Sequence, residues 1–251
     1  SEVGQLTGIP LGFNKQTGVP ILFDNFHPSL TNYNMVIFAK SGAGKSVTMK
    51  TLISRSSVLM GIESLALDAE GEYSAVADAL GGINVVISPT SKTIINLFDI
   101  EIERTKDEIT GRERPILNVE NKIEDVTQAL LTMARGSTRS EEVNELTKQI
   151  IAEAVAEEYT KAGITSDPNS LYEASNGGIR RENLFKEKKQ MPTIGSWYKT
   201  LIKKAKENTD PNYQFHYSYL LKVMKQYVRE LNGQMAYFDG QSTFELLAGA
   251  P

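Results

Sequence analysis

Short apolar runs alternate with helical patterns over the first hundred residues of the chain. The apolar runs cover 35–38, 62–68 and 83–87. A pattern of helical spacing follows each of the first two runs, over 47–59 and 72–80. Strands that are apolar almost throughout and alternate with helices are typical of a parallel sheet covered on both faces. We therefore predict an α/β fold with a parallel sheet in this part of the chain.

A pair of strands is predicted before the first of these runs. Residues 9–14 and 19–24 are rich in apolar side chains and flank the polar segment Lys15-Gln16-Thr17-Gly18. This spacing predicts a β-hairpin in which Gly18 adopts a left-handed conformation.

The pattern changes near residue 101. Residues 105–118 are polar and interrupted by Gly and Pro, as is 165–191, so both are predicted to be loops. Apolar residues recur at helical spacing in four other segments, which are 122–134, 141–159, the segment that opens at Pro192 and carries Ile194, Trp197 and Leu201, and 219–231. Four amphipathic helices in succession predict an all-helical lobe that is inserted into the α/β core or packed beside it.

These patterns predict three parts of the chain. The first half of an α/β core covers 1–100, the helical lobe covers 101–232, and 233–251 returns to the core. No apolar strand that ends in Asp-Glu precedes Pro251, and we expect the chain to be a piece of a longer protein.

The segment from Ala39 to Ser46 reads A-K-S-G-A-G-K-S, between a predicted strand and a predicted helix. Glycines in such a loop allow successive backbone N–H groups to point at an anion, and the start of the helix adds its positive end. A lysine here reaches the β- and γ-phosphates, and the following hydroxyl binds Mg²⁺. Ala39 stands where this motif usually has its first glycine, and it is small enough for the corner. The predicted phosphate-binding residues are Ser41, Gly42, Ala43, Gly44, Lys45, Ser46 and Val47, with Ser46 as the ligand of Mg²⁺.

Hydrolysis would also need a carboxylate near the γ-phosphate. Asp68 ends the second apolar run, and Glu70 and Glu72 follow it. We predict that Asp68 and Glu72 join Lys45 as catalytic residues, because carboxyl ends of parallel strands share one edge of the sheet. The alternative is that Asp68 caps the next helix while the glutamates are solvated.

Composition restricts the classes of function. The chain has 251 residues, of which 40% are hydrophobic and 23% are charged, as in ordinary globular proteins. It contains no cysteine, which excludes disulfides and thiolate metal sites, and its two histidines are too few to argue for a metal. A net charge of −4 excludes a uniformly basic nucleic-acid binder.

A local basic patch is compatible with that net charge. Lysines and arginines alternate with aromatic residues between Trp197 and Arg229. This pattern is open to nucleic-acid contact, but we favour aromatic residues that pack inside the lobe and lysines that face solvent.

Six stretches together resemble one family, the conjugation and type IV secretion ATPases. These TraC/TrbE-like, VirB-type enzymes are P-loop NTPases of the HerA–FtsK superfamily. The stretches are P-L-G-F-N-K-Q-T-G-V-P-I-L-F-D (Pro10 to Asp24), N-Y-N-M-V-I-F-A-K-S-G-A-G-K-S (Asn32 to Ser46), L-D-A-E-G-E-Y (Leu67 to Tyr73), A-L-G-G (Ala79 to Gly82), I-N-L-F-D (Ile95 to Asp99) and F-D-G-Q-S (Phe238 to Ser242).

The resemblance implies a RecA-like P-loop NTPase core, ATP rather than GTP as the nucleotide, and Mg²⁺ as its companion. It also implies a hexameric ring at the cytoplasmic face of the membrane, where it would join other secretion subunits and energise channel assembly or transport of DNA or protein. The Walker B strand, the sensor and the arginine that acts on a neighbouring subunit are expected beyond this chain. Two alternatives stay open at this point. One is a nucleotide-gated assembly or docking module with little turnover, and the other is a DNA-pumping translocase.

Overall fold

The computed structural model describes residues 8–88, 90–106, 111–136, 143–173 and 187–243. The chain divides into two compact units, and the boundary between them falls between Val85 and Val86. The sequence pattern placed this boundary at residue 100, but contacts group residues 86–100 and 233–243 with the helices of the second unit.

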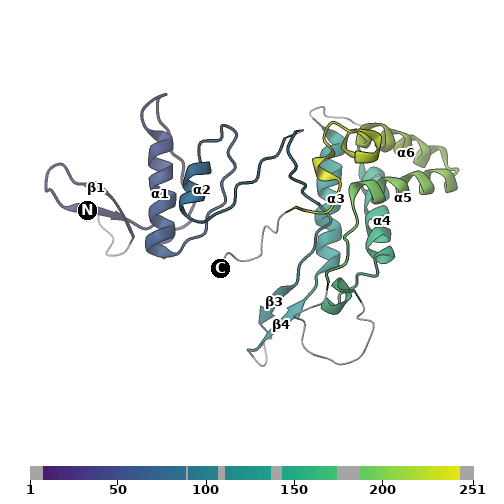
Figure 1. Ribbon diagram of the computed structural model, residues 1–251, viewed down its shortest axis with the longest axis horizontal. Coiled ribbons are helices and arrows are strands. Elements are labelled where there is room, and N and C mark those ends of the chain that lie inside the picture. Colours follow the sequence, from purple (N-terminus) through teal and green to yellow (C-terminus); the bar gives the residue numbers. More distant parts are fainter. Residues whose placement is uncertain (1–7, 89, 107–110, 137–142, 174–186, 244–251) are drawn as a thin grey trace. The chain divides into compact units, whose positions relative to one another are not determined.

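The first unit contains a β-hairpin and two helices (Figure 1). Strands β1 (Ile9–Phe13) and β2 (Pro20–Phe23) pair in antiparallel register, and Gly18 in their turn has φ 68°, as predicted. Helices α1 (Lys45–Met60) and α2 (Ser74–Ala79) follow. Gly61 ends α1 in a left-handed conformation, and its N–H donates to the Ser57 carbonyl at 3.0 Å.

The predicted parallel sheet is absent from the described residues, where two antiparallel strand pairs are the sheets observed. The apolar runs 35–38, 62–68 and 83–87 form no strand. Most of their side chains face solvent, and Phe38 is 91% and Leu67 is 98% exposed. A strand is stable only when a neighbour accepts its backbone hydrogen bonds and covers its side chains, and the described residues provide neither for these runs.

The second unit, which we call the helical unit, is mainly helical (Figure 1) and has its own apolar core. It contains α3 (Val119–Arg135), α4 (Glu145–Lys161), α5 (Ile194–Glu207) and α6 (Pro211–Met224). Short 3₁₀ turns lie at Pro168–Leu171, Lys225–Tyr227, Arg229–Leu231 and Ala236–Phe238. Helix α3 packs on α4, α4 on α5, and α5 on α6. The largest side chains buried between them are Trp197, Tyr159, Phe98, Leu130, Ile150, Ile151, Leu171, Ile194, Leu201, Leu220 and Met224.

Two parts of this unit differ from the sequence prediction. The predicted loop over 105–118 contains most of a hairpin of β3 (Glu103–Lys106) and β4 (Glu113–Ile116). The last helix begins at Pro211 rather than at residue 219, because Asp210 caps it and proline fits its first turn. The same helix ends at Met224, and Val228 is extended with ψ 119°.

The chain enters and leaves the helical unit through one set of hydrogen bonds, which we call the entry–exit clamp (residues 94–98, 191–195 and 237–243). The N–H of Ile95 donates to the carbonyl of Tyr237 at 2.9 Å. The Gln241 amide donates to the carbonyl of Met191 at 2.7 Å and accepts from its N–H at 3.0 Å. These bonds hold residues 94–98, 191–195 and 237–243 side by side.

Asp239 is the buried centre of the clamp, with 5% exposure. Its carboxylate accepts the N–H of Gly195 at 2.7 Å and the N–H of Arg229 at 2.8 Å. A Cβ at Gly195 would come within 2.9 Å of that carboxylate, so any larger residue would clash with it. The F-D-G-Q-S stretch thus ties the first turn of α5 to the end of the unit.

Candidate nucleotide-binding site

The predicted phosphate loop lies between residue 39 and the start of α1. Gly42 and Gly44 have φ of 75° and 90°, the left-handed region that the sequence predicted for them. The Ala43 N–H donates to the Lys40 carbonyl at 3.1 Å and closes a tight turn. A Cβ at either glycine would meet nothing within 4 Å. Backbone conformation, rather than space, therefore requires glycine at both positions.

Helix α1 begins without the cap that the long helices of the other unit have. Its N-cap is Gly44, no side chain bonds to its first turn, and that turn contains no acidic residue. The first backbone bond at this end is from the Thr48 N–H to the Gly44 carbonyl, at 2.9 Å. The N–H groups of Lys45, Ser46 and Val47 have no acceptor among the described residues.

The other long helices show how this chain usually satisfies such groups. Asn118, Asn144, Thr193 and Asp210 each accept an N–H in the first turn of α3, α4, α5 and α6, respectively. A helix start with free N–H groups attracts anions through these donors and through the helix dipole. At α1 the free donors coincide with an exposed lysine, Lys45, and a half-buried hydroxyl, Ser46. Together they form an arrangement that fits a phosphate group.

Asp68 closes a turn before α2. Its carboxylate accepts the N–H groups of Glu70 at 3.1 Å, Gly71 at 2.9 Å and Tyr73 at 2.8 Å. The Tyr73 N–H is the main reason that the pKa of Asp68 lies below its ordinary value, since each bond favours the charged form. Asp68 therefore holds the turn before α2 but does not cap the helix, because the N-cap of α2 is Tyr73 and no side chain bonds to its first turn. The proposed catalytic role of Asp68 stays a prediction.

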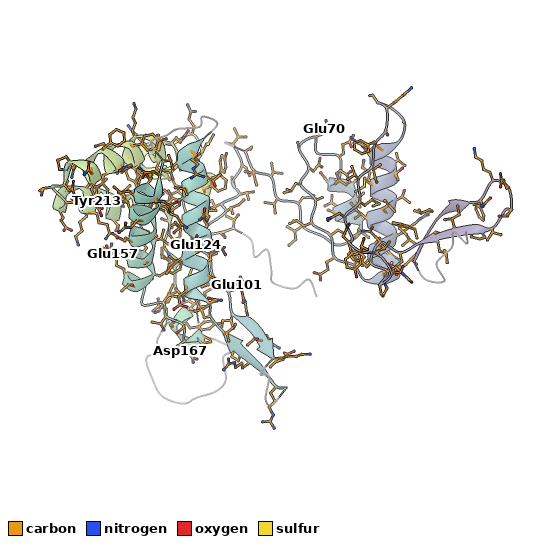
Figure 2. All side chains as sticks on the ribbon, turned by 180° about the vertical axis from the view of Figure 1, so that it is seen from behind. Glu70, Glu101, Glu124, Glu157, Asp167 and Tyr213 are labelled. Carbon is orange, nitrogen blue, oxygen red and sulfur yellow. The ribbon has the colours of Figure 1, made fainter. Side chains whose placement is uncertain are left out.

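Glu70 and Glu72 are exposed in the same turn, where Figure 2 labels Glu70. Neither carboxylate has a hydrogen bond or an ion pair among the residues that the structure describes. Of the two predicted catalytic carboxylates, Glu72 is thus the one whose oxygens accept no hydrogen bond from the described residues.

One contact that sequence analysis missed joins this turn to the phosphate-loop helix. The ammonium of Lys50 lies 5.7 Å from the centre of the Tyr73 ring. The spacing of Lys50 from Ser46 indicated the face of α1 on which Lys50 lies, but no signal in the sequence paired it with Tyr73.

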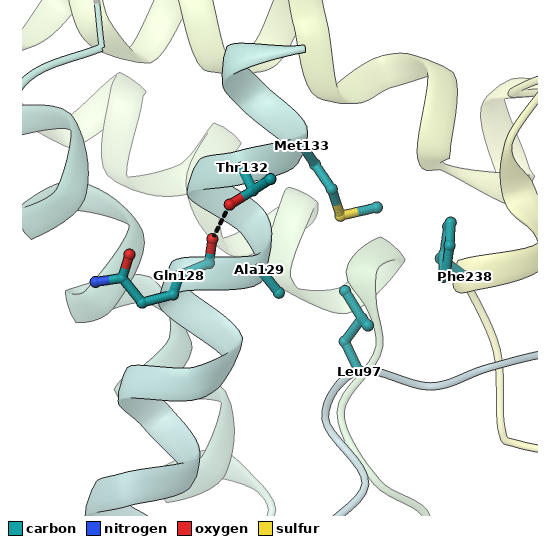
Figure 3. A pocket seen from close by; sticks show the side chains of 6 residues that line it. All are labelled: Leu97, Gln128, Ala129, Thr132, Met133 and Phe238. Atoms are coloured by element: carbon teal, nitrogen blue, oxygen red, sulfur yellow. Dashed lines mark hydrogen bonds between the residues drawn. The ribbon is translucent and has the colours of Figure 1, made fainter. Parts of the chain in front are cut away.

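The two histidines and the apolar pocket lie outside the phosphate loop and the Asp68 turn. His27 bonds to Ser29 at 2.7 Å, and His216 bonds to Thr147 in the first turn of α4 at 2.9 Å. No group of three or more potential metal ligands occurs among the described residues. Figure 3 shows an apolar hollow in the helical unit, and no phosphate-loop residue lines it. Its lining residues are Leu97, Gln128, Ala129, Thr132, Met133 and Phe238.

The aromatic residues of the basic segment mostly pack inside the helical unit. Trp197 and Tyr217 are buried, and the Tyr219 hydroxyl donates to the Ala134 carbonyl at 2.9 Å. Phe215 is the exception, at 53% exposure. The packing interpretation therefore holds for Trp197, Tyr217 and Tyr219.

Comparison with known proteins decides the family. A family model described as "Helicase HerA, central domain" matches residues 2–212. The chain belongs to this family. A solved structure, VirB4 of Thermoanaerobacter pseudethanolicus, is similar with a TM-score of 0.64 and 26% sequence identity. The match covers 98% of this chain and 56% of that one, so the chain spans little more than half of the VirB4 chain. No curated protein sequence matches.

These matches confirm the resemblance to VirB-type ATPases of the HerA–FtsK superfamily that the six sequence stretches indicated. The fold is mixed α/β and similar to VirB4. None of the helices among the described residues is long and apolar enough to cross a membrane.

Proposed function

We propose that this HerA-family chain binds ATP with Mg²⁺ at the phosphate loop and hydrolyses it as part of a longer motor protein. The observation that carries the proposal is the uncapped start of α1, where three free N–H groups adjoin Lys45 and Ser46. The residues that would contact the nucleotide are Ser41, Gly42, Ala43, Gly44, Lys45, Ser46 and Val47.

The residues also fit Mg²⁺ bound together with the nucleotide. The Ser46 hydroxyl makes no hydrogen bond among the described residues, and hard oxygen ligands suit this ion. We propose that Ser46 holds the ion, which supplies positive charge to the β- and γ-phosphate oxygens.

The proposed reaction is in-line attack of water on the γ-phosphorus. The bond between that phosphorus and the β,γ-bridging oxygen breaks, and ADP leaves with the electron pair. Lys45 stabilises the charge on the transferred group, and Glu72 accepts the proton of the attacking water. Asp68 holds the turn that carries Glu72.

By its family resemblance we further propose a place in type IV secretion. The complete protein would work as a hexamer at the cytoplasmic face of the membrane, together with other secretion subunits. An arginine of a neighbouring subunit would complete each site. The similarity to VirB4 supports this assignment.

The test is the substitution Lys45→Ala in the full-length protein, with Lys15→Ala in the exposed hairpin turn as a matched control. We expect Lys45→Ala to weaken binding of a fluorescent ATP analogue at least about tenfold, and to lower turnover about 10²-fold or more, because one charged clamp is lost. Lys15→Ala should change neither. Equal affinity and turnover in the two variants would refute the proposal.

Two measurements separate the alternatives. Lys45-dependent binding with a near-zero rate per subunit at every protein concentration would favour a nucleotide-gated docking module. Stimulation by DNA that falls steeply with salt would favour a DNA-pumping translocase.

A further inference from the structure

Lys50 and Tyr73 connect two segments of the proposed site that are far apart in the sequence. The Lys50 ammonium lies 5.7 Å from the Tyr73 ring centre, within the range of a cation–π contact. Both residues are half-buried, whereas most residues from 63 to 75 are exposed. The contact therefore links an otherwise exposed turn to α1.

On α1, Lys50 occupies a defined place relative to the phosphate loop. Residues four apart lie on the same face of a helix, one turn from each other. Lys50 is thus directly above Ser46, whose N–H is one of the free donors at the helix start. A group held by Lys50 is held close to the end of α1 that would bind phosphate.

Tyr73 has three connections within this part of the chain. Its ring contacts Lys50, and its N–H donates to Asp68 at 2.8 Å. Its carbonyl accepts the N–H groups of Val76 and Ala77, both at 3.0 Å, and so begins α2. The position of Tyr73 therefore determines the position of the turn from Asp68 to Glu72.

Glu72 is the residue directly before Tyr73. Its carboxylate has no partner among the described residues, unlike that of Asp68, which accepts three N–H groups. The placement of this free carboxylate depends on the backbone on either side of it. That backbone is held by Asp68 on one side and by the Lys50–Tyr73 contact on the other.

We infer that Lys50 and Tyr73 are positioning residues, whose contact sets the Glu72 carboxylate relative to the phosphate loop. The inference rests on the proposed ATP hydrolysis and goes beyond it, because it assigns roles to two residues outside the phosphate-loop motif. Neither residue need touch the nucleotide. Loss of the contact should therefore lower the rate of the chemical step more than it weakens binding.

The test compares matched substitutions in the full-length protein. Tyr73→Phe keeps the ring and Lys50→Arg keeps the charge, whereas Tyr73→Leu and Lys50→Met remove one partner at similar size. We expect Tyr73→Leu and Lys50→Met each to lower kcat about fivefold, with the Kd of an ATP analogue within about twofold of wild type. Tyr73→Phe and Lys50→Arg should stay within about twofold of wild type in both quantities.

The double variant distinguishes positioning from unrelated losses. If the two residues act through their mutual contact, Lys50→Met combined with Tyr73→Leu should lower kcat no further than either substitution alone. Multiplied effects in the double variant would overturn the inference, as would an unchanged kcat in Tyr73→Leu. A parallel loss of affinity and kcat in all four variants would indicate a general structural role and overturn it as well.

The outcome can be separated from that of the proposed function. Wild-type protein that turns over ATP in a Lys45-dependent manner, with no effect of Tyr73→Leu, would remove the positioning role alone. Wild-type protein that binds no ATP, or binds it without turnover at any concentration, would remove both.

Discussion

The two units of the chain differ in where their apolar side chains lie. The helical unit buries a continuous core between four capped helices, and its entry–exit clamp satisfies the buried Asp239. In the first unit, Ile9 and Leu52 are the buried apolar residues among those described, while most residues of the runs before α1, before α2 and after α2 face solvent. Apolar burial is the main favourable term in folding, so the two units should differ strongly in stability.

The same difference extends to polar groups. Each long helix of the helical unit uses a side chain to satisfy its first turn, whereas α1 leaves three N–H groups free. The helical unit thus satisfies its own helix starts, and the first unit presents donors and apolar surface to groups outside it. We expect binding capacity and low stability to have the same origin here, which is the lack of internal partners among the described residues.

The largest expected effect comes from separating the units. The segment Val86–Gly249 expressed alone should unfold cooperatively on heating, with a stability of roughly 5–15 kcal/mol, as for ordinary domains. Residues 1–85 alone should show no cooperative transition. Circular dichroism and calorimetry of both segments would check this. A sharp transition for residues 1–85 would contradict the expected difference in stability between the two units.

A smaller effect should follow from one substitution made in each unit. Leu130→Ala removes a fully buried side chain from the helical core and should cost about 2–5 kcal/mol. Leu67→Ala removes a side chain that is 98% exposed and should change stability by less than about 0.5 kcal/mol. Chemical denaturation of the two full-chain variants would measure both. Similar losses would show that the apolar run of Leu67 is covered in solution.

Local signals in the sequence predicted much of this structure. Residues within a short window were enough to predict several features. These are the hairpin with Gly18, helix α1, the first three helices of the helical unit and the left-handed glycines of the phosphate loop. The parallel sheet did not appear in the described residues, because apolar runs report which segments can become strands, but not whether partners for them are present. The capping signal Asp210-Pro211 was readable, but the apolar spacing after residue 219 suggested a later start.

The candidate site also contains features that the sequence indicated and features that it did not. The sequence indicated Lys45 and Ser46 because the phosphate-loop motif is contiguous and its chemistry depends on backbone conformation. The contact of Lys50 with Tyr73 depends on how two separate segments pack, and no residue pattern encodes it. Asp68 illustrates both, since its place after an apolar run was visible in the sequence, whereas its three bonds to the N–H groups of the following turn were not.

The smallest expected effect concerns the pH dependence of the Asp68 turn. Because the pKa of Asp68 is lower in the folded chain than in the unfolded one, its contribution to stability is fully present above its ordinary value, about pH 4. The contribution is lost as the pH falls through the lowered pKa, when protonation weakens the bonds from Glu70, Gly71 and Tyr73. NMR of the full chain should show the Gly71 and Tyr73 amide signals shifting together at acidic pH, with a midpoint below that of a free aspartate. In Asp68→Asn, which cannot ionise, the transition should be missing. A midpoint above that of a free aspartate would mean that the carboxylate is not bonded as described, and Asp68 would again be a candidate for the catalytic group.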